Sequence, residues 1–325
     1  MHEHLLVVKV AAEFQPPALN FLPVGSLTVD RHESEFGSWT STAWTPDAGT
    51  PLARAVVRIW YFDGSLGGAR ERVFPDGTLE LIVQFDTPHR PGIDAPAERF
   101  PPLCVTGLRS TAEVIEGPPG RCRVLGVKLS PSGAFALLRG ALAELTDLTA
   151  DLHDAIGRGA AELGTRLHGC RDGATAVRTA ARWAGDRIAR GAGPDPLVER
   201  AVAMIVADGG TQSMAMLEAW QGRSRTRFTA AFRDRVGATP KRFARIVRFD
   251  RALNALAARR HGLGEIALAT GYYDQAHFTA EFREHAGLTP RAYLAALRYP
   301  AVTSILDPEQ YFQDEDGSSR VEYVV

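Results

Sequence analysis

The feature that most constrains this chain of 325 residues is a short unit that occurs twice near its C-terminal end. The string SRTRFTAAFRDRVGATPKRF begins at Ser224, and the string DQAHFTAEFREHAGLTPRAY begins at Asp274. The two match at eight of twenty positions without a gap, and the matches include two Phe, one Gly and a Thr-Pro pair. So dense a match indicates an internal duplication, and it predicts two copies of one small unit over residues 212–297.

Each copy has the pattern of two short helices joined by a tight turn. In the second copy, residues 264–270 predict the leading helix, GYY the turn, and Asp274 the N-cap of a second helix that ends near residue 286. The first copy repeats this scheme, with a leading helix over residues 214–220 and a second helix over residues 224–236.

The sequence also predicts where the second helix of each copy ends. Gly237 and Gly287 are placed to end them in a left-handed conformation. A Thr-Pro pair follows each glycine, and this pattern places an N-cap before a proline at the first position of a new helix. Residues 240–260 are therefore predicted to form one long helix that joins the two copies.

Paired phenylalanines define a buried face on each second helix, and the opposite face carries donors suited to DNA. Phe residues four apart pack on one side of a helix, which leaves base-edge and phosphate donors among small residues on the other side. The candidate DNA-contacting residues are Arg225, Thr226, Arg227, Thr229, Arg233, Gln275, Ala276, His277, Thr279 and Arg283. One such face alone would more often be only solvated, whereas two faces held apart by one helix fit successive major-groove segments of a duplex.

On these residues the segment resembles the DNA-binding domain of AraC/XylS-type transcriptional regulators. The string GYYDQAHFTAEFREHAGLTP fits the signature of that family's second unit nearly residue for residue. The resemblance implies two helix-turn-helix units, over residues 212–236 and 264–286, whose second helices are the recognition helices. The first unit departs from the common pattern at Trp220. Ala230 and Ala280 stand where many members carry a larger polar side chain, which leaves the bases that are read open.

The distribution of charge supports a nucleic-acid partner. Residues 211–299 hold fifteen Lys or Arg against seven Asp or Glu, whereas the whole chain has a net charge of −1. A basic segment on an acidic body is typical of a DNA-binding module attached to another domain.

Cysteine usage and hydropathy favour a cytoplasmic protein. Cys104, Cys122 and Cys170 lack CxxC spacing and nearby paired histidines, which favours reduced thiols over a metal or redox site. No stretch reaches twenty apolar residues, and the apolar run near the N-terminus has neither a basic lead nor a small-residue cleavage site. We expect no membrane contact.

Residues 1–129 are predicted to be rich in β-structure. The runs VVRIWYF, TLELIVQF and CRVLGVKL are separated by Pro, Gly and Asp, and alternation in the second run puts Leu79, Leu81 and Val83 on one core-facing side. Residues 53–139 resemble an N-terminal sensory domain of unknown function found in one branch of AraC-type regulators. The resemblance implies a cupin-like β-barrel with a regulatory role. The predicted fold class is thus a multidomain α+β protein, with this barrel, a helical linker region and an all-α tandem helix-turn-helix domain.

Two kinds of site are weighed for the β-rich domain. Arg72, Asp76, Glu80 and Arg109 could line a polar ligand pocket, although surface and turn positions in a hairpin are the favoured interpretation. Trp60 and Phe62 are expected in the core. A metal-dependent cupin needs several converging His and a carboxylate, which the sequence does not offer, so we expect no metal, no cofactor and no enzyme activity.

The rest of the chain divides into three further segments. Residues 130–191 read as a helical linker region, and they carry an apolar stripe that could serve dimerisation but more often packs on its own domain. The stripe consists of Val177, Ala180, Ala181, Ala184 and Ile188. After the GAGPDP linker, residues 195–299 form the DNA-binding domain, and residues 300–325 are expected to be an acidic flexible tail.

These features predict a sequence-specific transcriptional regulator controlled at its N-terminal domain. Double-stranded operator DNA is the expected partner, and RNA polymerase, a small-molecule effector and a second copy of the chain are further candidates. The alternative is a cupin-type small-molecule-binding protein or enzyme tethered to DNA. The sequence leaves open the effector, the operator, the direction of regulation, the oligomeric state and the role of the three cysteines.

Overall fold

The computed structural model describes residues 23–34, 37–65, 70–92, 98–140, 142–191, 195–211, 224–296, 310–312 and 322–324. It shows a β-rich part followed by helices, as the predicted fold class requires. The strands are β1 (Gly25–Ser34), β2 (Gly37–Pro46), β3 (Val56–Ser65), β4 (Arg70–Val73), β5 (Leu79–Gln84), β6 (Arg90–Pro91), β7 (Leu103–Thr106), β8 (Glu113–Glu116), β9 (Arg121–Leu129), β10 (Thr149–Asp151), β11 (Gln310–Phe312) and β12 (Glu322–Val324).

Helices follow β9 and dominate the second half of the chain. They are α1 (Pro131–Leu138), α2 (Leu152–Ile156), α3 (Arg158–His168), α4 (Gly173–Ala189), α5 (Pro196–Ala207), α7 (Arg225–Val236), α8 (Pro240–Ala257), α9 (Leu263–Ala269), α10 (Gln275–Ala286) and α11 (Pro290–Ala296). Two 3-10 helices, η1 (Leu52–Arg54) and η2 (Leu142–Leu145), connect strands and helices. The leading helix expected over residues 214–220 lies outside the described residues.

Two sheets form the body of the N-terminal part. The larger sheet has the order β1-β2-β3-β9-β5-β7-β10 with antiparallel neighbours, and the smaller has the order β11-β12-β4-β8-β6. Within the described residues no strand of one sheet pairs with a strand of the other. The expected cupin-like barrel is therefore two open sheets within the described residues.

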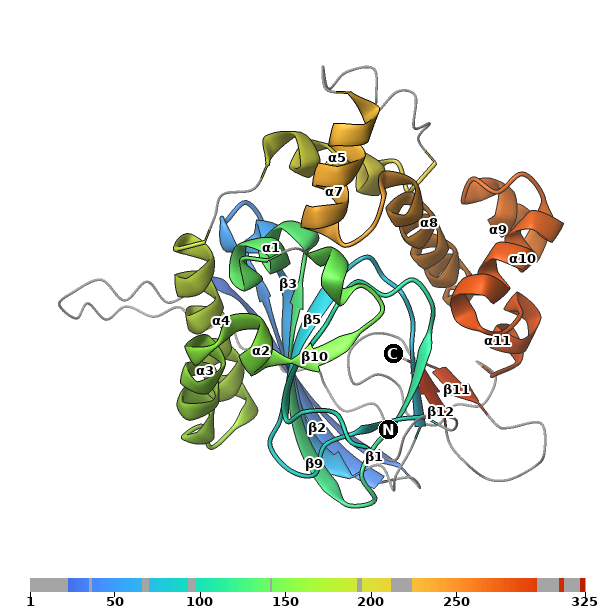
Figure 1. Ribbon diagram of the computed structural model, residues 1–325. Helices are drawn as coiled ribbons and strands as arrows, with labels where there is room; N and C mark the ends of the chain where they lie inside the picture. Colours follow the sequence, from blue (N-terminus) through green and yellow to red (C-terminus); the bar gives the residue numbers. More distant parts are fainter. Residues whose placement is uncertain are drawn as a thin grey trace.

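Strand alternation assigns the two faces of the larger sheet. Leu79, Leu81 and Val83 on β5 are buried, as predicted, in the core on the side covered by helices. Helix α4 packs its apolar stripe against β2 and β3, with α3 beside it (Figure 1). The stripe that could have served dimerisation is thus covered by the chain's own sheet. The intervening β5 positions face the smaller sheet.

The C-terminal helices are arranged around α8, which packs against α5, α7, α9, α10 and α11 (Figure 1). Its predicted start is confirmed, since the Thr239 side chain accepts a hydrogen bond from the backbone N–H of Arg242 and Pro240 follows as the first helical residue. Gly237 and Gly287 end α7 and α10 with φ values of 90° and 74°, the left-handed conformation that was predicted. Helix α8 ends three residues earlier than expected, at Ala257.

The N-terminal and C-terminal parts share their cores. One cluster of buried side chains joins Leu108, Leu137 and Leu142 to Phe232 and Phe243 of the helix-turn-helix region. A second cluster joins Phe74, between β4 and β5, to α8, α10 and α11. The sequence treated the DNA-binding segment as a separate module, whereas its helices complete the core of the β-rich part.

The acidic tail contributes two short strands. β12 pairs in parallel with β4, and β11 pairs with β12, so residues 310–312 and 322–324 extend the smaller sheet. This corrects the expectation of a flexible tail for these six residues. β4 would otherwise present an open edge of unpaired backbone groups, and QYF and EYV contain the aromatic and β-branched residues that favour strands.

Candidate nucleic-acid interface and ligand cavity

Helix α7 presents the first set of predicted DNA contacts. Phe228 and Phe232 are buried edge-to-face with ring centroids 5.8 Å apart, so the helix is anchored as expected. The opposite face leaves Arg225, Thr226, Arg227 and Arg233 exposed and Thr229 half-buried. Ser224 occupies the N-cap position, but its side chain makes no capping hydrogen bond.

Helix α10 repeats this arrangement. Phe278 and Phe282 are fully buried with their ring centroids 5.7 Å apart. The Asp274 side chain caps the helix by accepting a hydrogen bond from the backbone N–H of His277 at 2.7 Å. The exposed residues of the opposite face are Gln275, Ala276, His277 and Arg283, with Thr279 half-buried.

Two of these side chains already have partners within α10. The Thr279 hydroxyl donates to the carbonyl of Gln275 at 2.8 Å. His277 accepts a hydrogen bond at Nδ1 from the backbone N–H of Tyr273, and its Nε2 lies 3.7 Å from the carboxylate of Glu281. Gln275 and Arg283 have the more accessible positions for DNA contacts on this helix.

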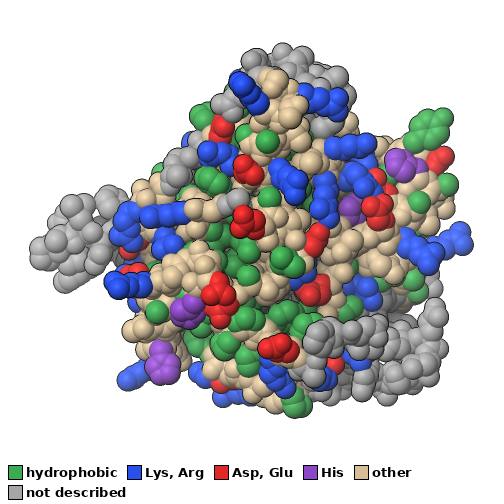
Figure 2. All heavy atoms as spheres, in the orientation of Figure 1, with side chains coloured by type: hydrophobic (Ala, Val, Ile, Leu, Met, Phe, Trp, Pro, Cys, Tyr) green, Lys and Arg blue, Asp and Glu red, His purple; other side chains and the backbone are tan. Residues whose placement is uncertain are grey.

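Basic side chains gather over the same region of the surface. In Figure 2 the Lys and Arg side chains over α7, α8 and α10 lie close together, with acidic side chains among them. Arg225, Arg227 and Arg233 of α7 are exposed, which allows both base and phosphate contacts.

A buried ion-pair cluster, missed in the sequence, fixes α10 on α8. Glu281 is 6% exposed and accepts hydrogen bonds from Arg245 at 3.0 Å and from Arg248 at 2.7 Å. Burial alone would raise the pKa of Glu281, but the hydrogen bonds and charges of Arg248 and Arg245 hold it below its ordinary value. The Arg248 guanidinium also stacks over Tyr272 at 4.8 Å. The only sequence signal was the difference between Glu281 and its counterpart Ala231.

Tyr273 is a second residue of this surface that was not predicted from the sequence. It is 86% exposed in the turn between α9 and α10, directly before the cap of α10. An aromatic ring this exposed beside a recognition helix is available to contact a sugar or base. The sequence held one indication of this exposed ring, because the turn GYY does not itself require a second aromatic residue.

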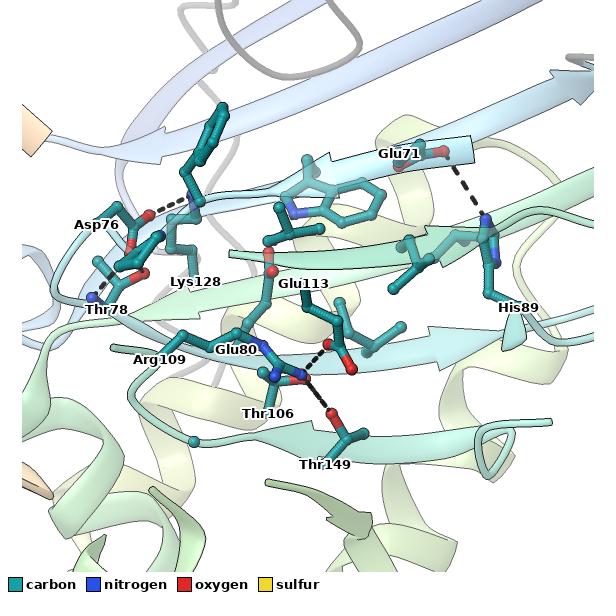
Figure 3. A pocket seen from close by; sticks show the side chains of 18 of the residues that line it. Glu71, Asp76, Thr78, Glu80, His89, Thr106, Arg109, Glu113, Lys128 and Thr149 are labelled. Atoms are coloured by element: carbon teal, nitrogen blue, oxygen red, sulfur yellow. Dashed lines mark hydrogen bonds and ion pairs between the residues drawn. The ribbon is translucent and has the colours of Figure 1, made fainter. Parts of the chain in front are cut away.

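A cavity of about 240 Å³ lies between the two sheets (Figure 3). Its walls come from β3, β4, β5, β7, β8, β9 and β10, and helices α8 and α11 close one side. The residues contributed by the helices are Asp250, Leu253, Asn254, Ala257 and Tyr293. The helix that joins the two DNA-binding units is therefore also part of the cavity wall.

The candidate pocket residues from the sequence come together here in part. Asp76, Glu80 and Arg109 line the cavity. Asp76 does lie in the turn between β4 and β5, as the favoured interpretation expected, whereas Glu80 on β5 faces the cavity and not the solvent. The position of Glu80 was missed because a second sheet covers the polar face of β5, and the alternation within β5 does not show this. Arg72 instead donates a hydrogen bond to the Ala286 carbonyl at the end of α10. Trp60 is buried, as expected, and also faces the cavity.

Two ion pairs occupy the cavity wall. Lys128 donates to Asp76 at 2.7 Å, and Thr78 donates to the same carboxylate. Burial alone would raise the pKa of Asp76, but Lys128 and Thr78 together hold it below its ordinary value. At the middle of the cavity, Arg109 pairs with Glu113 and donates to Thr149 at 2.8 Å (Figure 3).

Three further titratable groups have shifted pKa values. Burial raises the pKa of Glu71 to about 7. Burial, with the nearby charge of Arg99, lowers the pKa of His89 to about 4, so its imidazole is neutral near neutral pH. Burial also raises the pKa of Glu80, against the opposing effects of Lys128 and of the Trp60 indole N–H, which donates to Glu80 at 2.5 Å.

Other expected sites can be located as well. Cys104 and Cys122 are buried, Cys170 is half-buried, and all three are free thiols. In the described part of the chain, no group of three or more His, Cys, Asp or Glu is arranged to hold a metal ion. Among the described helices, none is both long and apolar enough to cross a membrane.

Two family models match the chain, one in each half. A model described as a helix-turn-helix domain matches residues 221–296, which include both recognition helices. The match supports the AraC/XylS-type transcriptional regulator that the sequence resembles. A second model, described as a domain of unknown function (DUF6597), matches residues 46–151 of this AraC/XylS-type regulator. It is a DNA-binding regulator whose N-terminal part has no assigned role.

Solved structures with similar folds have low scores. ToxT from Vibrio cholerae with a bound unsaturated fatty acid is 12% identical, with 81% of this chain and 96% of that chain covered and a TM-score of 0.40. The C-terminal domain of AraT, a response regulator from Geobacillus stearothermophilus, is 20% identical over 31% of this chain and 85% of that chain, with a TM-score of 0.30. The assignment of this AraC/XylS-type regulator rests on the family models alone. No curated protein shows a significant match to the chain.

Proposed function

We propose that this regulator binds an operator through α7 and α10 and that a small molecule in the cavity between the sheets controls this binding. One observation supports the link. Helix α8 contributes Asp250, Leu253, Asn254 and Ala257 to the cavity wall, and the same helix joins the two DNA-binding units. A ligand that contacts α8 more favourably in one orientation than in another would change how α7 and α10 meet the duplex.

The proposed DNA contacts are the exposed residues of the two recognition helices. They are Arg225, Thr226, Arg227 and Arg233 on α7 and Gln275, Ala276, His277 and Arg283 on α10, together with the half-buried Thr229 and Thr279 of the same faces. Selection of bound sequences from a random DNA pool tests this half of the proposal, and the width of the site reports whether both units engage. If the units contact six or more phosphates, affinity should fall roughly a thousandfold or more between about 50 and 200 mM salt. Recovery of no preferred sequence would contradict it.

Control by the cavity can be tested before any ligand is known. Ala257 lines the cavity from α8, so Ala257→Trp fills part of the space that a ligand would occupy. We expect this variant to change operator affinity by about fivefold or more, the usual scale of coupling between two sites. Ala258→Trp is the matched control, since Ala258 is exposed at the end of the same helix. Equal operator affinities for the wild type and both variants would contradict control through the cavity.

The division of the chain follows from this function. We propose a sensory domain over residues 1–129, a helical region over residues 130–191 and a DNA-binding domain over residues 195–299, acting in the cytoplasm. RNA polymerase and a second copy of the chain are the other proposed partners. Light scattering of the protein with and without its selected operator gives the stoichiometry, and a palindromic site bound by one copy would contradict a dimer.

A further inference from the structure

The cavity has an excess of acidic side chains. Its lining includes five carboxylates and two basic side chains, and the neutral His89 adds no charge. The carboxylates are Glu71, Asp76, Glu80, Glu113 and Asp250. Both basic side chains are already engaged, Lys128 with Asp76 and Arg109 with Glu113. A negatively charged ligand would therefore have to break an existing ion pair to find a cationic partner.

Glu71 and His89 form an acceptor pair at one end of the cavity, opposite the Asp76–Lys128 end (Figure 3). Glu71 Oε1 and His89 Nε2 lie 3.9 Å apart, too far for a direct hydrogen bond. The amide of Gln84 is oriented by its donation to the Pro101 carbonyl, so its oxygen faces His89. His89 Nδ1 lies 2.9 Å from that oxygen and must carry the proton, which leaves Nε2 as an acceptor.

This pair is suited to a donor that reaches both atoms at once. The pKa of Glu71 is about 7, and a cation bound beside it favours its ionised form. Ionised Glu71 has no hydrogen to donate to His89 Nε2, and Nε2 has none to donate to Glu71. A ligand nitrogen that carries two N–H bonds and lies near both atoms would satisfy both acceptors. An ammonium group supplies several N–H donors and a positive charge, and hydrogen bonds between charged groups are the stronger kind.

Aromatic side chains provide the rest of the binding surface. Trp60 lies over Gly126 of the neighbouring strand, where even a Cβ would approach its ring to about 2.1 Å, so the glycine makes room for the indole. The indole is held by its hydrogen bond to Glu80. Phe62, on the same strand and the same face, also lines the cavity. The Phe100 backbone N–H donates to the His89 carbonyl, which places Phe100 beside the acceptor pair.

We propose that the cavity binds an organic cation, with a primary or secondary ammonium between Glu71 and His89 and an aromatic or apolar body against Trp60, Phe62 and Phe100. Aromatic faces and carboxylates both attract cations, and here they line one partly enclosed space. This inference rests on the proposed function of the cavity as the effector site. It adds the chemical class of the effector.

Three probes with one shared ring system test the class of ligand. They are tryptamine, which carries an ammonium, indole-3-propionate, which carries a carboxylate on a similar chain, and the neutral 3-ethylindole. Calorimetric titration of the full chain should show tryptamine binding about tenfold or more tightly than indole-3-propionate, with 3-ethylindole between them. Equal or tighter binding of the carboxylate, or no binding of any probe, would overturn the inference.

Two variants with the same chemical change locate the binding. Glu71→Gln keeps the shape of the side chain and removes its charge. It should lower the affinity for tryptamine about tenfold and leave the affinity for 3-ethylindole unchanged. Glu116→Gln is the matched control, because Glu116 lies on the adjacent strand β8, pairs with Arg90 and does not line the cavity. Unchanged tryptamine affinity in Glu71→Gln would place the ammonium elsewhere and overturn the assignment.

Operator binding separates this inference from the proposed function. Tryptamine that binds in a Glu71-dependent way without changing operator affinity would support the ligand class and contradict control through the cavity. Indole-3-propionate that binds in preference to tryptamine and changes operator affinity would support the control and overturn the ligand class.

Discussion

At the scale of single residues, Arg225 and Arg233 lie on the exposed side of α7 about two turns apart, and we predict different roles for them on DNA. Arg225 is in the first turn, where a side chain reaches base edges, so Arg225→Ala should relax base preference in one half of the site by about 1 to 3 kcal/mol. Arg233→Ala should weaken binding to all DNA sequences alike. It should also reduce the slope of log affinity against log salt concentration by about one. Selection of bound DNA sequences with both variants checks this. Gln275→Ala should relax base preference less than Arg225→Ala does. A shift in base preference from Arg233→Ala alone would mean that α7 is rotated differently on DNA.

Glu71 allows a pH-dependent prediction at the same scale. Its pKa is raised from the ordinary 4.5 to about 7 by burial, so the folded state holds the proton more tightly than the unfolded state. Folding stability is therefore lost as the pH rises from about 4.5 to about 7. Glu71→Gln should raise the free energy of unfolding at pH 8 by roughly 1 to 3 kcal/mol relative to the wild type and change it little at pH 4. Urea denaturation at both pH values measures this, and an equal effect at both would contradict the shifted pKa.

At the scale of elements, the second helix-turn-helix unit depends on its buried ring pair. Phe278 is fully buried against Tyr272 and Phe282, and truncating such a ring costs on the order of 3 to 5 kcal/mol. Phe278→Ala should abolish DNA binding through unfolding of this unit, visible as lost amide protection in α9 and α10. Tyr273→Ala is the matched control, since Tyr273 is exposed in the same unit and its loss should leave folding intact. Normal protection with lost binding in Phe278→Ala would show that this ring contacts DNA.

The elements also show what the sequence could predict and why. Local signals placed α7, α8 and α10 within three residues at each end, because caps such as Thr239 and glycines such as Gly237 act within one helical turn. Alternation in β5 predicted the core face correctly. It could not show that Glu80 on the other face is covered, because β4 pairs with β8 in a second sheet, and no pattern within β5 indicates that this sheet lies over it. The acceptor pair of Glu71 and His89 was hidden for the same reason.

At the scale of the whole molecule, the DNA-binding helices are docked on the β-rich part by polar contacts as well as by a shared core. Arg242 on α8 pairs with Asp147 at 2.7 Å. His285 Nδ1 lies 2.6 Å from the Ser110 carbonyl, and the Ala112 N–H donates to the His285 carbonyl at 2.6 Å. These contacts join segments more than a hundred and seventy residues apart in the case of His285, so no local pattern could have predicted them. They hold the DNA-binding helices against the β-rich part.

The shared core leads to a prediction about cooperative unfolding. Phe232 of α7 is fully buried in the cluster that also contains Leu137 and Leu142 of the β-rich part, and α7 packs against α1 and η2. Phe232→Ala leaves a cavity that both parts share, so it should destabilise both by about 3 to 5 kcal/mol. Four of the five tryptophans lie before residue 190, so their fluorescence follows mainly the β-rich part and α4. In urea, the transition seen by tryptophan fluorescence should shift to lower concentration together with the loss of operator binding. A fluorescence transition that stays at its wild-type midpoint while operator binding is lost earlier would mean that the two parts unfold independently.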